Sequence, residues 1–252
     1  MSCLNKILAL GAFFVAVVLS WLLAPVQGVP ILAYHMVNED PEAYSIDTVD
    51  FDRHMKYLAD QGYTAISLTE YFMARDGQKK LPDKPIIITF DDGYADNYLT
   101  ALPILEKYQL KATVFVISEA VGQPNYLTWE QIKTMQSQNT EIGSHTASHI
   151  ALGQADVTEK RRQIAKSKKT LEQNLGTPVD FLAYPFGSYD ADIFPLLAET
   201  GYRGACTGLP GYNNLDQHVY TLKRISIPRP KYGMWEFKLR MLRASIYSKL
   251  GL

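Results

Sequence analysis

Two adjacent carboxylates, Asp91 and Asp92, directly follow a run of apolar and β-branched residues in the segment PIIITFDDGY. Like charges repel each other, and strand formation does not require them. Two histidines, His145 and His149, stand four residues apart in GSHTASH, and a third, His35, directly follows the apolar segment PILAY. Carboxylates and imidazoles bind divalent metals and transfer protons in hydrolytic enzymes. These five side chains are therefore the first candidates for a functional site.

The spacing of His145 and His149 suits one shared metal ion, because side chains four residues apart share a face where the chain turns helically. An acid from a neighbouring strand end would complete a set of two histidines and one carboxylate. The metal would offset the repulsion between the aspartates: one would bind it, and the other would act beside it as a general base. Taken alone, an Asp-Asp pair is more often a helix cap, and paired histidines often lie on a surface. Their occurrence together favours a metal site.

Short apolar segments alternate with segments of helical period from Val29 onward. The strand candidates are PILAY, TAISL, PIIITF, ATVFVI, EIGS, FLAYPFG, GACT and LKRISIP. The helical segments are FDRHMKYLADQGY, LTALPILEKYQ, TWEQIKTMQSQ, TEKRRQIAKSKKTLEQNLG and DIFPLLAETGY. This alternation predicts an α/β fold, with a parallel sheet closed into a barrel and helices outside. Such barrels carry their chemistry on loops after the strands, so we expect His35, Asp91, His145 and the turn 185–187 at one rim.

Composition sets outer limits on domain number and function. The chain has 252 residues, of which 47% are hydrophobic and 20% charged, and this suits one globular domain. Its formal net charge of −1 gives no electrostatic basis for binding nucleic acid. The two cysteines are Cys3, which lies in the N-terminal apolar segment, and Cys206. The fold is therefore not a disulfide scaffold.

The first 28 residues read as a targeting segment. One positive charge, Lys6, precedes an apolar run from Ile7 to Leu23, and small residues follow as far as Gly28. This pattern is typical of an export signal or of an uncleaved membrane anchor, and the run is at the short end for a spanning helix. Both interpretations place the remaining chain outside the cytoplasm, either secreted or anchored to the cell membrane.

The motifs TFDDGY, GSHTASH and AYPFGSYD, in this order, resemble the three leading motifs of the polysaccharide deacetylase family, whose catalytic unit is the NodB-like domain. The resemblance runs from Val29 to about residue 230 and implies a distorted (β/α) barrel with one divalent metal ion. Zinc is the first expectation for this metal, and nickel, cobalt and iron are alternatives. The implied activity is removal of acetyl groups from N-acetylated sugars. Residues 231–252 extend beyond the resemblance.

Residue by residue, the resemblance implies that Asp91 is the catalytic base. The implied metal ligands are Asp92, His145 and His149. The third motif of the family begins with an arginine that orients the base, but Ala183 occupies that position here. The usual tyrosine of that motif is replaced by Phe186, whose backbone N–H would still supply the oxyanion donor. The late leucine-x-histidine of the family, which supplies the acid, is not visible near RISIPR.

The missing acid has a candidate in one branch of the family, the poly-N-acetylglucosamine deacetylases, whose acid histidine comes from the first strand. PILAYHMV is similar to that element and implies His35 as the acid, although a buried structural histidine is the alternative. AYPFG also resembles this branch. Several residues near the motifs could contact sugar rings or could instead belong to the core: Tyr94, Trp129, Tyr184, Pro185 and Tyr189.

We therefore expect a metal-dependent hydrolase that removes N-acetyl groups from an envelope or extracellular polysaccharide containing N-acetylglucosamine, with release of acetate. Two alternatives remain open: a non-catalytic glycan-binding domain on the same fold, and an amidase for a small non-sugar substrate. A binding domain would not need Asp91, and export favours a glycan substrate. Peptidoglycan, poly-N-acetylglucosamine and a chitin-like polymer all remain possible substrates.

The C-terminal segment 231–252 is basic and has helical period. Its apolar residues recur at spacings of four, three, four and four, at positions 235, 239, 242, 246 and 250. Five basic residues stand against one acid, Glu236. The first interpretation is a final helix that packs this apolar stripe on the barrel and leaves the basic face in water. The second is an amphipathic helix that lies on an anionic membrane surface.

Overall fold

The computed structural model describes residues 3–24 and 26–251. Its helices are α1 (Cys3–Leu23), α2 (Thr48–Asp60), α3 (Leu68–Arg75), α4 (Leu102–Lys107), α5 (Trp129–Ser137), α6 (Val157–Leu175), α7 (Ile193–Glu199) and α8 (Met234–Leu250). Its strands are β1 (Val29–Tyr34), β2 (Met36–Val37), β3 (Ser45–Ile46), β4 (Thr64–Ala65), β5 (Pro85–Phe90), β6 (Thr113–Val116), β7 (Glu141–Ser144), β8 (Phe181–Ala183), β9 (Gly204–Cys206), β10 (Tyr212–Asn213) and β11 (Ile225–Ser226). Three short helical turns are η1 (Asn97–Ala101), η2 (Leu152–Gln154) and η3 (Pro185–Gly187).

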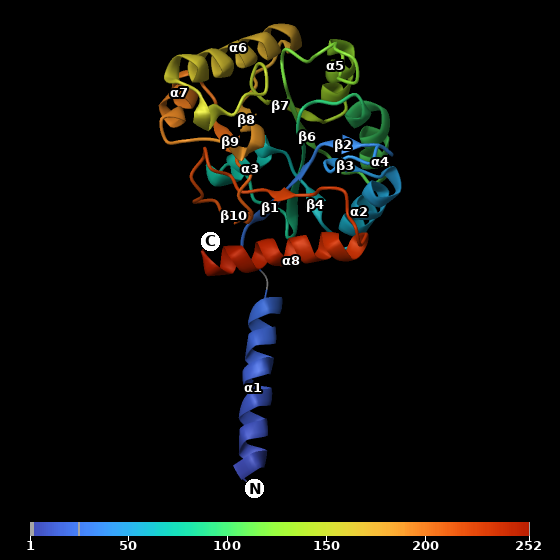
Figure 1. The fold of residues 1–252 in the computed structure, drawn as a ribbon, viewed down its shortest axis with the longest axis vertical. Helices are drawn as coiled ribbons and strands as arrows, with labels where there is room; N and C mark the ends of the chain where they lie inside the picture. Colours follow the sequence, from blue (N-terminus) through green and yellow to red (C-terminus); the bar gives the residue numbers. More distant parts are fainter. Residues whose placement is uncertain (1–2, 25, 252) are drawn as a thin grey trace.

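The main sheet has the order β10-β1-β5-β6-β7-β8-β9, and β4 and β11 pair with β5 and β1. Its pairings are parallel except that of β10 with β1. The sheet curls into a half-barrel with helices around it (Figure 1). Its two ends approach each other, because Cys206 in β9 bridges to Leu222, just before β11. The predicted fold class, a single α/β domain built as a distorted (β/α) barrel, is confirmed.

The strands are continuous apolar runs because both faces of the sheet are covered. Side chains alternate between the faces along each strand. In β5, Ile87 points into the half-barrel, whereas Ile86 and Ile88 point outward beneath the helices. The inner cluster contains Val29, Ile31, Ile87, Phe115, Phe181, Ala183, Cys206 and Leu222. Cys206 is a free, buried thiol in this cluster, and the side chain of Cys3 lies outside the described residues.

The five predicted helical segments form α2, α4 with η1, α5, α6 and α7. In α6, Ile164 and Leu171 are buried, and Gly176 caps the helix in the left-handed region at φ 72°. Sequence analysis missed α3, since only the first two residues of the predicted strand TAISL are extended. Ser67 starts α3 instead, because its hydroxyl accepts from Glu70 N–H while the Glu70 carboxylate accepts from Ser67 N–H. The short antiparallel strand β10 was also not predicted.

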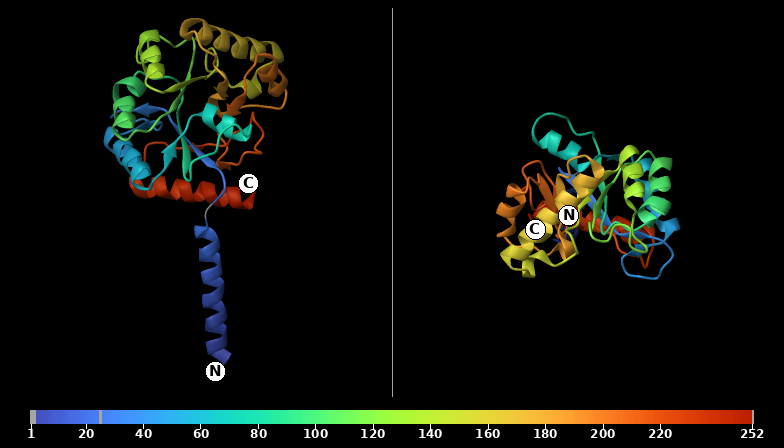
Figure 2. Two further views of the ribbon diagram at one scale, coloured as in Figure 1. Left: turned by 180° about the vertical axis from the view of Figure 1, so that it is seen from behind. Right: turned by 90° about the horizontal axis from the view of Figure 1, so that it is seen from above.

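The two terminal helices lie on one side of the domain. Helix α8 runs along that side, and α1 leaves the domain there and stands away from it (Figures 1 and 2). Among the described residues, none of the helices combines the length and apolar character needed to cross a membrane.

The first interpretation of the C-terminal segment was wrong about which face packs. Phe237, Met241 and Ala244 are the buried side chains of α8. Trp235 and Leu239, from the predicted packing stripe, are exposed. The buried residues and the predicted stripe both recur at helical spacing, so spacing does not distinguish them. The ring of Phe237 stacks on that of His54 in α2, with the ring centroids 4.0 Å apart. The stripe therefore remains on the outer side of the helix.

Candidate active site

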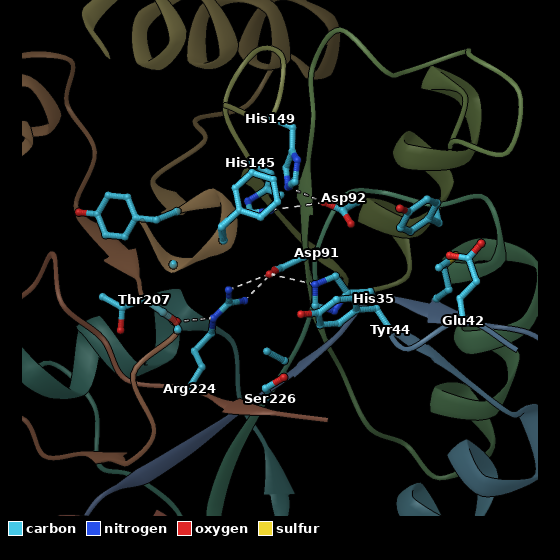
Figure 3. A pocket seen from close by; sticks show the side chains of 17 residues that line it. His35, Glu42, Tyr44, Asp91, Asp92, His145, His149, Thr207, Arg224 and Ser226 are labelled. Carbon is cyan, nitrogen blue, oxygen red and sulfur yellow. Dashed lines mark hydrogen bonds and ion pairs between the residues drawn. The ribbon is translucent and has the colours of Figure 1, made fainter. Parts of the chain in front are cut away.

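The candidate residues meet at the carboxyl ends of the parallel strands, as predicted. His35 follows β1, Asp91 and Asp92 follow β5, and His145 follows β7. These four side chains and that of His149 line one pocket of about 420 Å³ (Figure 3). The strands place them there because β1 pairs with β5 and β6 lies between β5 and β7.

Asp92, His145 and His149 form a compact group of metal-type donors. Oδ1 of Asp92 lies 3.4 Å from Nε2 of His145 and 3.2 Å from Nε2 of His149. One ligand atom from each of the three residues lies within 4.8 Å of the other two. Figure 3 shows all three side chains directed at one point above Asp91. This set of two imidazoles and one carboxylate fits a divalent metal of the zinc type.

The hydrogen bonds of these residues also fit a cation. Oδ1 of Asp92 is buried and has no hydrogen-bond partner. Nδ1 of His145 lies 2.8 Å from the carbonyl oxygen of Ala183. If Nδ1 carries the proton and donates it to this carbonyl, Nε2 keeps a lone pair directed at Asp92. Oδ1 of Asp92 and Nε2 of His145 then face each other as acceptors with no proton between them, an arrangement that a cation satisfies.

The two histidines are brought together by a turn rather than by the helix that their spacing suggested. Residues 145–149 form no helix, and Thr146 and His149 have positive φ angles of 66° and 59°. Asp92 is also in the left-handed region, at φ 74°. Non-glycine residues rarely adopt this conformation, and it clusters at functional sites. Strained backbone on both sides of the cluster therefore holds the three ligand atoms together.

Burial and neighbouring charges control the protonation of this cluster. Burial, and then the charge of Asp91, raise the pKa of Asp92 to about 6. Burial lowers the pKa of His145 to about 3 and also lowers that of His149. Both imidazoles are consequently neutral at pH 7, which is the form that binds metal. A bound cation would in addition favour the ionised form of Asp92.

Asp91 has a different environment, which sequence analysis did not foresee. Nη1 of Arg224 donates to Oδ1 and Nη2 donates to Oδ2, each at 2.7 Å, and both side chains are buried. Burial alone would raise the pKa of Asp91, but Arg224, followed by His145, holds this pKa well below its usual range. The carboxylate is thus ionised and fixed in orientation.

Arg224 pairs with Asp91 in a chain that has Ala183 where the third motif of the family has an arginine. Its Nε donates to the carbonyl oxygen of Thr207 at 3.0 Å, which fixes the guanidinium plane. The only sequence signal was an arginine inside the apolar strand candidate LKRISIP, where a buried charge needs a partner. The Asp91 carboxylate is therefore held in its orientation by a residue just before β11.

His35 lies beside Asp91 at the edge of the pocket. Its Nε2 is 4.0 Å from Oδ2 of Asp91, and its ring packs against Tyr44 with centroids 4.8 Å apart. Nδ1 of His35 is buried and has no hydrogen-bond partner. Asn97 donates to the backbone carbonyl oxygen of His35 at 2.8 Å and so fixes the start of this loop. His35 is therefore part of the pocket wall and not a satisfied core histidine.

The proposed sugar contacts divide into two groups. Tyr94 and Phe186 line the pocket, and the Phe186 side chain is 75% exposed with its backbone at φ 58°. Tyr184 touches the pocket only from the core: it is fully buried, and its hydroxyl donates to the carbonyl oxygen of Tyr220. Trp129 begins α5, and neither it nor Pro185 is among the residues that line the pocket. Closeness to the motifs in the sequence therefore did not distinguish side chains that line the pocket from side chains that do not.

Comparison with known proteins agrees with this geometry. The sequence profile of the polysaccharide deacetylase family matches residues 78–205, about half of the chain. The Bacillus subtilis (strain 168) protein YxkH, whose name places it among polysaccharide deacetylases, is 35% identical over 198 residues, which are 79% of this chain and 71% of that protein. The Streptococcus pyogenes deacetylase PplD, solved in complex with acetate, has a TM-score of 0.79 and 29% identity, covering 86% of this chain and 99% of that one.

A more distant relative is the poly-beta-1,6-N-acetyl-D-glucosamine N-deacetylase of Staphylococcus aureus (strain MSSA476). It is 26% identical over an alignment of 180 positions that covers 66% of this chain. The aligned part is 62% of that enzyme, so the chain spans less than two thirds of its length. Because the family profile covers half of the chain and YxkH aligns over most of both sequences, this chain belongs to the polysaccharide deacetylase family and is an enzyme of that family.

Proposed function

We propose that the chain is a metal-dependent N-deacetylase of an extracytoplasmic polysaccharide that contains N-acetylglucosamine. The observation that carries the proposal is the division of the two aspartates. Asp92 faces two neutral imidazoles, and Asp91 is paired with Arg224 beside His35, all in one pocket. A glycan-binding domain would not need a buried, oriented carboxylate next to a metal-type cluster.

The metal would be held by Asp92, His145 and His149, and zinc is the proposed ion, with nickel, cobalt and iron as alternatives. When bound, such an ion polarises the acetyl carbonyl and makes a water molecule more acidic. Three protein ligands would hold such an ion, which is the number typical of catalytic zinc sites. The buried carbonyl of Ala183 would keep His145 in the tautomer that presents Nε2.

Asp91 is the proposed general base. It accepts a proton from the attacking water, and Arg224 keeps the carboxylate ionised and in one orientation. His35, on the other side of Asp91, is the proposed acid that protonates the leaving amine nitrogen. The backbone N–H of Phe186 is the proposed donor to the developing oxyanion. The products are acetate and a sugar with a free amine.

The substrate class is inferred from the relatives and from the pocket wall. Tyr44 and Phe186 present exposed aromatic side chains to the pocket, and such rings stack on the apolar faces of sugars. The S. aureus relative is named for poly-beta-1,6-N-acetyl-D-glucosamine. We therefore propose this polymer first. An amidase for a small non-sugar substrate is less suited to a pocket with exposed aromatic walls.

We propose that the catalytic domain, residues 29–230, lies outside the cytoplasm, because residues 1–28 read as an export signal or an anchor. Envelope and extracellular glycans lie outside the cytoplasm, where such a segment would deliver the domain. The substrate proposal does not depend on whether the segment is cleaved.

Acetate release tests the proposed function. The purified chain, loaded with metal, is incubated with poly-beta-1,6-N-acetyl-D-glucosamine, peptidoglycan and a chitin-like polymer, and acetate is measured over time. We expect release from the first polymer at the highest rate. Binding of polymer without acetate from any of the three would support the glycan-binding alternative and contradict the proposal.

Substitution of His35 separates the acid from the metal site. His35→Gln is expected to keep bound metal and to slow amide cleavage by about 10²–10⁴-fold, the usual effect of losing a general acid. An ester substrate such as an aryl acetate should lose much less activity, because its leaving group needs no proton. Equal losses on amide and ester would mean that His35 only supports the pocket.

Substitution of Arg224 tests the orientation of the base. Arg224→Lys keeps a charge but cannot form the two parallel hydrogen bonds, so kcat should fall while metal content is unchanged. The pKa of Asp91 should rise, because the held carboxylate loses part of its stabilisation. The acid limb of the pH–rate profile should therefore move to higher pH. An unchanged acid limb, with lower Tm alone, would show that Arg224 has only a structural role.

A further inference from the structure

Helix α8 has two apolar faces, and only one of them packs on the domain. Phe237, Met241 and Ala244 are buried. A helix turns by about 100° per residue, so positions 235, 239, 242, 246 and 250 lie on the opposite side. On that side Trp235 is 71% exposed and Leu239 is 53% exposed. We call positions 235, 239, 242, 246 and 250 the outer stripe. A row of large apolar side chains in water is uncommon on a monomeric domain and marks a binding surface.

Basic side chains border the outer stripe on both sides. Lys238 and Lys249 lie along one edge of the helical projection, and Arg243 and Arg240 lie along the other. Glu236 is the only acid in α8, and it accepts from Arg240 at 2.7 Å. The segment is therefore strongly cationic in a chain whose formal net charge is −1. An apolar stripe between two cationic edges is the pattern of helices that lie in a lipid interface.

The outer stripe faces the side of the domain from which α1 departs. Figure 1 and the left view of Figure 2 place α1 beyond α8 and away from the sheet. Nζ of Lys249 donates to the carbonyl oxygen of Trp21 at 2.6 Å and lies 5.3 Å from the centroid of its ring. Phe13 and Phe14 of α1 are also exposed. Two separate apolar surfaces of the chain thus lie on this one side.

We propose that α8 binds an anionic lipid surface through the outer stripe, with its axis in the plane of the interface. The apolar side chains would enter the boundary of the acyl chains, and Lys238 and Arg243, one on each edge of the stripe, would reach the lipid phosphates. A second copy of the chain is a poorer partner, because a symmetric contact would bring two cationic helices together.

This orientation would also place the active site with respect to the lipid, a consequence that rests on the proposed function. Arg240 and Arg243 line a second hollow whose other walls include Gly208, Arg224 and Ser226. The same three residues line the active-site pocket. The pocket therefore continues towards α8, so lipid binding would hold it next to glycan at the membrane surface.

A single tryptophan reports directly on the outer stripe. The sequence has three tryptophans, and Trp21→Phe with Trp129→Phe leaves Trp235 alone in the full chain. The protein is added to phosphatidylglycerol-containing vesicles with brominated acyl chains. We expect a blue shift and quenching of Trp235 emission. Trp235 that stays unquenched in vesicle-bound protein, or a chain that does not bind these vesicles, would overturn the proposal.

The cationic edges are tested with the domain 29–252, which contains all the described buried core residues. Lys238→Gln with Arg243→Gln should weaken binding to phosphatidylglycerol vesicles by about 25-fold, since each basic residue contributes roughly fivefold. Binding to pure phosphatidylcholine should change little. Lys133→Gln with Lys169→Gln is the matched control, because it removes the same charge from α5 and α6.

Three results would overturn the lipid assignment in this second experiment. One is an equal loss in the control pair, which would indicate only general charge attraction. Another is unchanged vesicle binding by Leu239→Asp, a substitution at an exposed position of the stripe that should not disturb folding. The third is a dimer that Leu239→Asp converts to a monomer in light scattering, which would assign the stripe to a second copy. Acetate release should be unchanged in every variant on a soluble oligosaccharide.

Discussion

Asp91→Asn is expected to retain metal and to lose turnover by about 10²–10⁴-fold, the range for removal of a general base. Asparagine has nearly the same shape but cannot accept a proton at this site. Asp91 is not among the three metal-type donors, so metal content should stay stoichiometric. Acetate release and metal content are measured on the same preparation.

The asparagine also leaves Arg224 buried without its counter-charge, so stability must be followed in parallel. The pKa of Asp91 is depressed in the folded state, so its contribution to stability is present above the unfolded pKa. This contribution is lost as the pH falls through the pKa that Asp91 has in the folded state. The difference in free energy of unfolding between wild type and Asp91→Asn should therefore become smaller in acid. Asp96→Asn is the control, a half-buried carboxylate that does not line the pocket. Turnover near the wild-type rate in Asp91→Asn would place the base elsewhere.

Alanine substitution of any of the three proposed ligands is expected to abolish stoichiometric metal binding. Asp92, His145 and His149 supply one donor each, and three protein ligands leave no spare. Loss of a supporting partner alone costs about 10–100-fold in affinity, so loss of a ligand should exceed this range. The measurement is metal content after gel filtration, followed by competition with a chelator of known affinity.

His218→Ala serves as the control for these variants, because His218 is exposed and does not line the pocket. It should hold metal as the wild type does. A variant with two of the three ligands replaced, which folds normally and still carries one metal per chain, would rule out this site.

The sequence was sufficient to predict the strand-end cluster for a physical reason. In a parallel barrel every carboxyl strand end lies at one rim, so residues that directly follow strands must meet. His35, Asp91 and His145 could be placed in this way without knowing any distance. The turn that brings His149 to His145 could not, because it depends on the left-handed backbone at Thr146 and His149. Their spacing of four residues suggested a helix.

Arg224 could not be paired with Asp91 from the sequence, because the two residues are 133 positions apart and no local period connects them. The contact arises only when β11 pairs with β1 beside β5. The same kind of limit applied to α8. Phe237, Met241 and Ala244 repeat at the same helical spacing as the outer stripe, so periodicity could not decide which face packs. The face with Phe237 packs because Phe237 contacts His54, which lies in α2, far from α8 in the sequence.

The central claim, that the Asp92-His145-His149 site holds a metal on which N-deacetylation depends, has one most direct test. The purified chain is stripped with a chelator, its metal content is verified, and acetate release from poly-beta-1,6-N-acetyl-D-glucosamine is measured before and after one equivalent of zinc is returned. We predict no release from the stripped protein and recovery in proportion to the metal added. Release at the original rate from protein that is shown to be metal-free would contradict the claim.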